Sequence, residues 1–407
     1  MWKFLTALSL CWGHLWAQTP KPIAAVMAGH YTDTTGLFWL AFAPKAKVSV
    51  ENLSELITKK HAAWFGKIEK LAIKDSFLSK EAKIFHVICH RNPKPATTDF
   101  SFVTGSCAFQ YFFPFNKARR TRNPIFTIMQ AQKPEFMLWL GDNIYYILGE
   151  WNSNKQMLKK NLRVRNRRPI KEFMELCPQY ALWDDHDYGP NNSDGSFKNK
   201  NKTLAMFKKT WLNPYYGFEQ GENTGVASHF QRGDCAFFMM DTRWYSDLGA
   251  NVMLSDAQIA WLEKQLLAST ANFKFICLGA QVLTDDKHGV HLGKCPVERQ
   301  KLIDMLTRNN IKGVVLISGD RHFSEINQWK RDNAYTLQEF TISPLTSFID
   351  ERASKNSYRL PNSFITETNF ARFDIAGEGD NRTCTVELLS RTGKSYWKHS
   401  ISLKELK

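Results

Sequence analysis

Three short segments of the sequence concentrate side chains that could bind metal ions or move protons. The first contains Asp142 and Tyr145, and the third contains Asp320 and His322. Between them, residues 183–194 hold four acids, a histidine and two asparagines. Such side chains could hold a pair of metal ions roughly 3.5–4 Å apart, which neutralise phosphoryl oxygens and generate a strong nucleophile from water. The chemistry these segments suggest is therefore hydrolysis of a phosphate ester.

Asp142 could bridge two ions. It follows an apolar run, 136–140, and a glycine that frees the backbone at the end of that run. Tyr145 could bind as a phenolate, which favours a hard trivalent ion such as ferric iron. The alternatives are a helix N-cap for Asp142 and a packing role for Tyr145.

The segment 183–194 is the most unusual in the chain. Its clustered carboxylates repel one another and raise one another's pKa unless a cation holds them together, so a metal site containing Asp185 is the simple explanation. A solvated acidic turn is the alternative. We expect the amides of Asn191 and Asn192 to contact the substrate.

Asp320 and His322 again follow an apolar strand. Being two residues apart in an extended loop, they point the same way and could bind one ion or two neighbouring ions. An ordinary buried histidine is the alternative for His322. Arg321, between them, could contact phosphate.

The elements that must position these side chains are strands followed by helices, which indicate an α/β domain. Each chemical segment lies at the end of a run of strand-forming residues, where α/β sheets gather ligands. Helices are expected over 255–268, with Ser255 as N-cap, and over 297–308. The runs that end in polar groups are 100–104, 135–140, 172–183, 273–278 and 314–317.

The N-terminal part differs from this pattern. Residues 1–17 have the charge, apolar core and small cleavage-site residue of a signal peptide, with cleavage expected after Ala17. A buried helix or a membrane anchor is the alternative, but the apolar stretch falls short of the ~20 residues that span a bilayer. We therefore expect export to a periplasm or the extracellular space, with no membrane span.

Residues 18–99 alternate apolar and polar side chains between turns, which predicts a small β-sandwich of the immunoglobulin or fibronectin type III kind. Prolines at residues 93 and 95 cannot continue a strand ladder, so a boundary is expected there. The larger domain would cover 100–407. With 43% hydrophobic residues, the chain can form two cores.

The chain is basic, with a formal charge of +15. Such a surface could steer anionic substrates, or the basic run could be a solvated helix face. No nucleic-acid-binding module accompanies it, so a small phosphoester is the expected partner of a monomer. Eight basic residues without an intervening acid are Lys155, Lys159, Lys160, Arg163, Arg165, Arg167, Arg168 and Lys171.

Cysteine usage singles out one thiol. Eight cysteines fall to seven once Cys11 leaves with the signal peptide, so at least one thiol stays unpaired. Cys107, at a strand end, is the candidate for a functional one.

Four motifs occur together and in a fixed order: Gly-Ser-Cys at 105–107, Gly-Asp-x-x-Tyr at 141–145, Trp-Asp-Asp-His at 183–186 and Ser-Gly-Asp-x-His at 318–322. In this combination the chain resembles the PhoD-like alkaline phosphatases, also called alkaline phosphatase D, within the calcineurin-like metallophosphoesterases. The resemblance spans roughly residues 25–375. It implies an αββα sandwich preceded by the small β domain.

The resemblance also implies roles for individual residues. Cys107, Asp142 and Tyr145 correspond to ligands of a ferric-type site, with Asp142 bridging to a second ion. Asp185 and Asp320 would hold that second ion. By the same resemblance His322 takes the place of a metal ligand, and His186, with Asp185, forms the catalytic centre that stabilises or protonates the leaving group.

The motifs do not fix the identity of the metals. The resemblance favours Fe³⁺ with Ca²⁺, while Zn²⁺ or Mn²⁺ remain alternatives. Cys107 stands where the broader superfamily has an Asp-x-His pair, a change that the PhoD-like branch shares. Gln281 stands where a metal-binding histidine is often found, and either metal or substrate contact or strand-end packing would explain it.

The expected activity is in-line attack on phosphorus by a metal-bridging hydroxide. A phospholipase D-type phosphodiesterase is the alternative within the same chemistry, because the same metal core cleaves diesters when the pocket admits a second substituent. A non-catalytic metal-binding surface protein is the alternative from another class.

Overall fold

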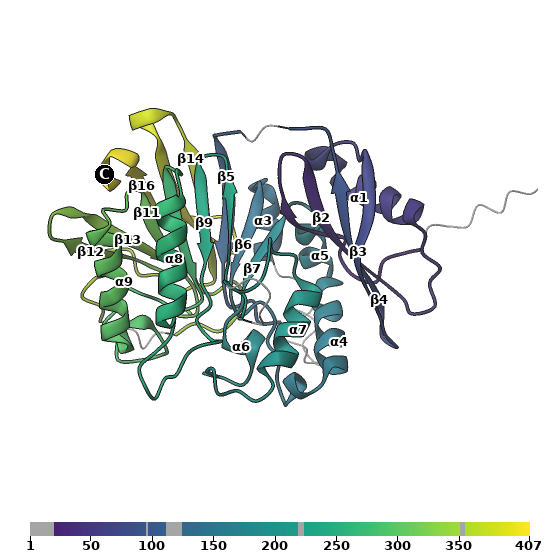
Figure 1. The fold of residues 1–407 in the computed structure, drawn as a ribbon, viewed down its shortest axis with the longest axis horizontal. Coiled ribbons are helices and arrows are strands. Elements are labelled where there is room, and N and C mark those ends of the chain that lie inside the picture. Colours follow the sequence, from purple (N-terminus) through teal and green to yellow (C-terminus); the bar gives the residue numbers. More distant parts are fainter. Residues whose placement is uncertain (1–19, 95–96, 111–123, 219–223, 351–354) are drawn as a thin grey trace, which may run out of the picture.

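The computed structural model describes residues 20–94, 97–110, 124–218, 224–350 and 355–407, so the expected signal peptide, 1–17, lies outside the described residues. Two six-stranded sheets face each other at the centre of the molecule (Figure 1). In the first sheet β5, β6 and β7 are parallel. Its strand order is β16 (Ser395–Ser402), β15 (Thr383–Ser390), β14 (Asn369–Ala376), β5 (Phe100–Gly105), β6 (Phe136–Leu140) and β7 (Gln179–Leu182).

The second sheet also has a parallel centre, formed by β13, β11, β10 and β9. Its strand order is β12 (Glu325–Arg331), β13 (Ala334–Thr341), β11 (Val314–Ser318), β10 (Phe273–Leu278), β9 (Cys235–Met239) and β8 (Ser228–Arg232). A strand is therefore present before each chemical segment, and these strands are divided between two sheets. The expected run 172–183 was too long, because its first residues belong to helix α5 (Arg168–Met174) and only residues 179–182 form a strand.

Aromatic side chains join the two sheets. Phe102 stacks on Phe136 and Phe373 of its own sheet, with ring centroids 5.0 and 4.7 Å apart, and meets Phe237 and Phe275 of the other sheet edge-on. All five are fully buried. Such rings bury large apolar areas in defined geometry, so the strand ends of one sheet are held at a fixed place relative to those of the other.

Helices cover the outer face of each sheet, giving four layers in the order helix, sheet, sheet, helix (Figure 1). The helix predicted over 255–268 is confirmed as α8, and the Ser255 side chain accepts a hydrogen bond from Gln258 N at 3.3 Å. The second sheet is covered by α8 (Asp256–Ala268) and α9 (Pro296–Arg308), and the first by α3 (Pro124–Ala131), α4 (Asn154–Arg165), α5 (Arg168–Met174) and α7 (Lys200–Thr210).

Short helical turns complete the connections. They are η1 (Glu150–Asn152), α6 (Asp185–Tyr188), η2 (Leu292–Lys294), η3 (Gly379–Asn381) and η4 (Leu403–Leu406). Across the described ranges, no helix has the length and apolar character needed to cross a membrane.

The N-terminal part forms one antiparallel sheet and a helix. The predicted β-sandwich is not confirmed, because α1 (Val50–Phe65) covers one face of the sheet where a second sheet was expected. Ser49 and Asn52 form a capping box, and Leu53, Leu56 and Ile57 follow with helical spacing. The sheet has the order β1 (Met27–Tyr31), β2 (Thr35–Phe42), β4 (Lys83–His90) and β3 (Lys70–Leu78).

The other face of this sheet packs against the larger part of the chain. Trp39 lies in one hydrophobic cluster with Trp139 and Trp211, and its indole nitrogen donates to Lys209 O at 2.9 Å. The division at residues 99 and 100 into separate domains stays a prediction.

Candidate metal centre

The predicted site residues meet at one edge of the paired sheets. Cys107 follows β5, Asp142 follows β6, Asp185 follows β7 and Asp320 follows β11. These four strands are parallel within their sheets, so their carboxyl ends lie at the same edge. The structure therefore brings together segments more than 200 residues apart in sequence.

The backbone at the site is strained. Cys107, Asp142, Asp320 and His322 have φ angles of 58°, 54°, 67° and 57°. This left-handed region costs a non-glycine residue about 1–2 kcal/mol. The cost is offset by hydrogen bonds between the loops, such as Ala108 N to Asp142 O at 2.9 Å. Strain of this kind concentrates at functional sites, where it aims side chains that regular structure would turn away.

Three overlapping groups of side chains have ligand atoms within 4.8 Å of one another. Asp142 belongs to two of the groups, and so does Asp185, which is the arrangement expected of carboxylates that bridge neighbouring ions. The groups are Cys107, Asp142 and His322; Asp142, Asp185 and His186; and Asp184, Asp185 and Asp320.

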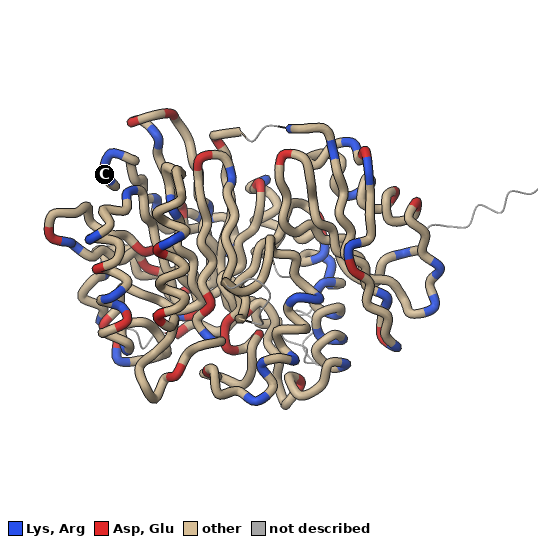
Figure 2. The backbone as a smooth tube through the Cα atoms, viewed as in Figure 1, with Lys and Arg blue, Asp and Glu red and all other residues tan. Residues whose placement is uncertain are grey.

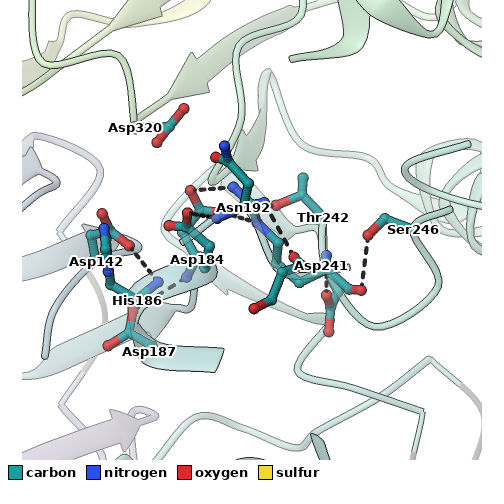
Figure 3. Close-up of polar contacts among 12 residues, drawn as sticks. Asp142, Asp184, His186, Asp187, Asn192, Asp241, Thr242, Ser246 and Asp320 are labelled. Carbon is teal, nitrogen blue, oxygen red and sulfur yellow. Dashed lines mark hydrogen bonds and ion pairs between the residues drawn. The ribbon is translucent and has the colours of Figure 1, made fainter. Parts of the chain in front are cut away.

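Two adjacent aspartates have different roles. Both oxygens of Asp184 are taken by the buried Arg243, whose Nε and Nη2 lie 2.5 and 2.9 Å from Oδ1 and Oδ2. Asp185 accepts one hydrogen bond at Oδ2, from Asn192 N at 2.6 Å, while its buried Oδ1 has no hydrogen-bond partner in the described part of the chain. Asp185 is therefore the aspartate that is free to bind a cation, because Arg243 compensates the charge of Asp184. Figure 3 shows the side chains of Asp142, Asp184 and Asp320 together at this edge of the sheets.

Asp187 ties the loops after β6 and β7 together. Its carboxylate accepts the backbone N–H groups of Asn143, Ile144 and Asp184 at 3.0, 2.8 and 3.2 Å. The neighbouring His186 N donates to Asp142 Oδ1 at 3.1 Å. These bonds fix Asp142 between the two loops.

The imidazole of His322 is oriented to offer one nitrogen. Nδ1 lies 2.7 Å from the carbonyl oxygen of Phe348, and because a carbonyl only accepts, Nδ1 carries the proton. Nε2 of the neutral ring is then left with a lone pair. Metal-binding histidines commonly have this second hydrogen bond, so His322 is prepared as a ligand.

The cluster is electrostatically unfavourable without a cation. Burial and then the charges of Asp185 and Asp184 raise the pKa of Asp142 well above its ordinary value. Burial and then Asp142 raise the pKa of the Cys107 thiol, and burial and then Asp184 raise the pKa of Asp320 to about 7. A bound cation reverses each of these effects, because metal ligands must be deprotonated.

Tyr145 and His186 lie against each other beside Asp142. Their rings stack with centroids 4.3 Å apart, and the buried Tyr145 hydroxyl makes no hydrogen bond to the described residues. Together with Asp185 Oδ1, this hydroxyl is a buried oxygen that a cation would satisfy. The donors present therefore fit metal ions.

The predicted substrate contacts divide into two kinds. Asn191 and Asn192 are exposed in the loop beyond His186 and remain accessible. The guanidinium of Arg321 is instead occupied by Asp286 at 2.5 Å and by the carbonyl of His288 at 2.8 Å. A direct contact between Arg321 and phosphate is not supported by this geometry.

Gln281 is fully buried behind the site. Its Nε2 donates to Glu325 Oε1 at 2.6 Å and to Thr341 Oγ1 at 3.0 Å. The geometry thus favours strand-end packing, which the sequence left open as one of two explanations.

Ser343 is a site residue that the motifs did not indicate. Its hydroxyl donates to Cys107 Sγ at 3.3 Å and accepts from His322 N at 3.0 Å. Ser343 lies two residues after the end of β13 and directly before a proline, so its position near a strand end was the available signal. Within the described ranges every cysteine is a buried free thiol, Cys107 included.

The four-layered fold thus gathers a cluster of side chains that could hold metal ions, as expected of a metal-dependent phosphatase. The family described as PhoD-like phosphatase matches residues 102–383, which is more than half of the chain. The chain belongs to this family. The resemblance inferred from the motifs is therefore confirmed.

Individual relatives are distant. The chain is 23% identical to alkaline phosphatase D of Bacillus subtilis (strain 168) over 277 residues, 53% of this chain and 46% of that protein. It thus spans about half the length of the curated relative it matches.

Two solved structures show the same fold. The "Structure of PhoD" has a TM-score of 0.68 at 14% identity, covering 96% of this chain and 92% of the other. Purple acid phosphatase PPD1 from yellow lupin (Lupinus luteus) seeds has a TM-score of 0.61 at 10% identity, covering 93% and 74%. The predicted mixed α/β fold is confirmed.

Proposed function

We propose that this protein hydrolyses phosphate esters, using at least two metal ions held at the strand ends. One observation carries this proposal: Asp142 and Asp185 are each shared between two groups of candidate ligands, and within each group the ligand atoms lie within 4.8 Å of one another. Membership of the PhoD-like phosphatase family supports it. The substrate is a small phosphoester bound by a monomer.

The donor chemistry suggests two unlike positions. Cys107, Tyr145 and His322 would hold an ion that prefers thiolate, phenolate and imidazole, for which ferric iron is the candidate. Asp185 and Asp320 offer only carboxylate oxygens, which suit Ca²⁺, with Zn²⁺ or Mn²⁺ as alternatives. Asp142 would bridge the two. When bound, the ions supply charge neutralisation at the phosphoryl oxygens and an activated water.

His186 is the residue best placed to act on the substrate directly. Its ring is stacked on Tyr145 and partly exposed, while its backbone is held by Asp142. Burial lowers the pKa of His186, partly opposed by the charge of Asp185. From this position the imidazole hydrogen-bonds a phosphoryl or leaving-group oxygen, and Asn191 and Asn192 contact the remainder of the substrate.

The test compares metal content and turnover in the purified protein. We expect bound metal by elemental analysis and hydrolysis of p-nitrophenyl phosphate, both lost in Asp142→Asn and retained in the exposed control Asp256→Asn. Absence of metal together with unchanged turnover in Asp142→Asn would overturn the proposal in favour of a non-catalytic protein. Parallel assays of bis(p-nitrophenyl) phosphate and phosphatidylcholine identify the ester class, and a strong preference for either makes the protein a phosphodiesterase.

Export is part of the same proposal. The charge and apolar pattern of residues 1–17 support cleavage after Ala17. N-terminal sequencing of protein recovered outside the cytoplasm should begin at Gln18. An uncleaved Met1 in that fraction would contradict a cleavable signal.

A further inference from the structure

Exposed apolar side chains gather on two loops beside the metal centre. Leu148 is 96% exposed and follows the half-exposed Ile147, three residues beyond the predicted ligand Tyr145. Phe348 is 60% exposed and precedes Ile349, and its ring lies 4.2 Å from that of His322. The other large apolar side chains exposed among the described residues are isolated along the chain: Val50, Ile73, Leu78, Leu176, Leu267 and Val297.

Leu148 is held outward by a strained backbone. Its φ angle is 51°, in the left-handed region that disfavours a leucine by about 1–2 kcal/mol. A side chain this exposed gains no packing that would offset the cost. The turn is closed by a hydrogen bond from Glu150 N to Ile147 O at 3.0 Å, so the backbone holds the leucine at the exposed tip of the loop.

The loop that carries Leu148 is anchored to helix α4. Glu150 Oε2 accepts from Ile147 N at 3.0 Å and pairs with Lys160 Nζ at 2.9 Å. The loop is therefore fixed in place, and Leu148 projects from it as a preformed apolar tip.

The predicted basic run is divided between structural and exposed side chains. Lys160 pairs with Glu150, Arg165 is buried and Arg167 donates to Gln110, whereas Arg168 is exposed and pairs with Glu172 at the surface. Three of the eight side chains are therefore held within the fold, and the basic surface is smaller than the sequence indicated.

The remaining part of the run includes two exposed lysines on α4, which follows the Leu148 loop in the chain. Lys155 and Lys159 are four residues apart on one helix face, and neither makes an ion pair within the described ranges. Figure 2 shows Lys and Arg positions along this helix. An exposed apolar tip followed closely in the chain by exposed cations matches the surface of a bilayer, whose phosphates lie above its acyl chains.

We propose that this face binds anionic lipid bilayers, with Leu148 entering the headgroup region and Lys155 and Lys159 contacting lipid phosphates. The metal centre would then lie at the bilayer surface. This binding is independent of the proposed hydrolysis, since none of the three side chains is a metal ligand or a substrate contact.

The test is sedimentation of the full chain with vesicles. We expect binding to vesicles of phosphatidylcholine and phosphatidylglycerol in equal amounts, and much weaker binding to phosphatidylcholine alone or in high salt. Replacing Lys155 and Lys159 by glutamine should weaken binding by about fivefold for each lysine. Leu148→Asn should weaken it by about tenfold.

The asparagine variant has a built-in control for folding. Asparagine tolerates the left-handed backbone, so the melting temperature of Leu148→Asn should equal or exceed that of the parent. Leu78→Asn replaces a leucine that is 71% exposed far from the site and should bind vesicles like the parent. Equal binding by the two leucine variants, or no preference for anionic vesicles, would overturn the proposal. Turnover of p-nitrophenyl phosphate should be unchanged in both.

Discussion

At the scale of the residue, Cys107 offers the most specific test of the metal assignment. Its Sγ lies 3.8 Å from Asp142 Oδ2 and receives the hydroxyl of Ser343, a donor that stabilises a thiolate. We predict that Cys107→Ala lowers iron content and removes visible charge-transfer absorption, measured by elemental analysis and absorption spectroscopy. Cys177→Ala deletes an equally buried thiol on another loop and should leave both unchanged. An unaltered spectrum in Cys107→Ala would exclude this thiol from the centre.

The buried ion pair between Asp184 and Arg243 leads to a second prediction at the scale of the residue. Both side chains are buried, so removing one partner leaves an uncompensated charge. We predict that Arg243→Gln lowers the free energy of unfolding by about 3–5 kcal/mol, measured by urea denaturation. Adding Asp184→Asn should recover part of the loss, because the unpaired carboxylate is then neutral. Additive losses in the double variant would mean that the pair is not coupled.

At the scale of the element, α1 is attached to its sheet through a neutral histidine. His61 Nε2 lies 2.8 Å from Val26 O, and Nδ1 accepts from Trp64 Nε1 at 3.2 Å. Burial lowers the pKa of His61 to about 4. Between that value and the unfolded value near 6.5, the unfolded chain binds more protons. The contribution of His61 to stability is therefore full above pH 6.5 and is lost as the pH falls toward 4.

We predict that His61→Gln, which keeps a donor and an acceptor, removes part of the acid sensitivity. The difference in unfolding free energy between pH 7 and pH 4.5 should shrink by on the order of 2–3 kcal/mol, measured by denaturant titration at each pH. His288→Gln changes a histidine in an exposed loop and is the matched control. Parallel pH profiles for His61→Gln and the parent would contradict this account.

At the scale of the whole molecule, the candidate metal centre joins the two sheets. Its candidate ligands come from strand ends of both sheets, and the aromatic core between the sheets holds those ends in place. A ligand that binds only the folded state stabilises it by about 3 kcal/mol at a hundredfold excess over Kd. We predict that a chelator lowers the melting temperature and that restored metal reverses the change, measured by calorimetry. Asp142→Asn should respond weakly, and an equal response would place the stabilising ion elsewhere.

Much of the site could be predicted because its signals are local. At Asp142, Asp185 and Asp320, a few consecutive residues contain a strand-forming run, then a glycine or tryptophan, and then an acid. The alternation of strands and helices is equally local, since it depends on side-chain period and capping. The sequence alone therefore determined the mixed α/β fold, the family and the positions of the main candidate ligands.

Tertiary structure decided which polar groups are free to act. Asp184 and Asp185 are adjacent aspartates in the same motif. Arg243, 59 residues beyond Asp184, pairs with Asp184 and leaves Asp185 unpaired by an arginine. Gln281 is held by Glu325, 44 residues away, and Ser343 reaches Cys107 across 236 residues. Helix α1 is a further example. Its capping box is a local signal, but which of its faces is buried became clear only from the sheet on which it packs. Hydrogen-bond partners and burial depend on contacts between distant segments, so they follow only from the folded chain.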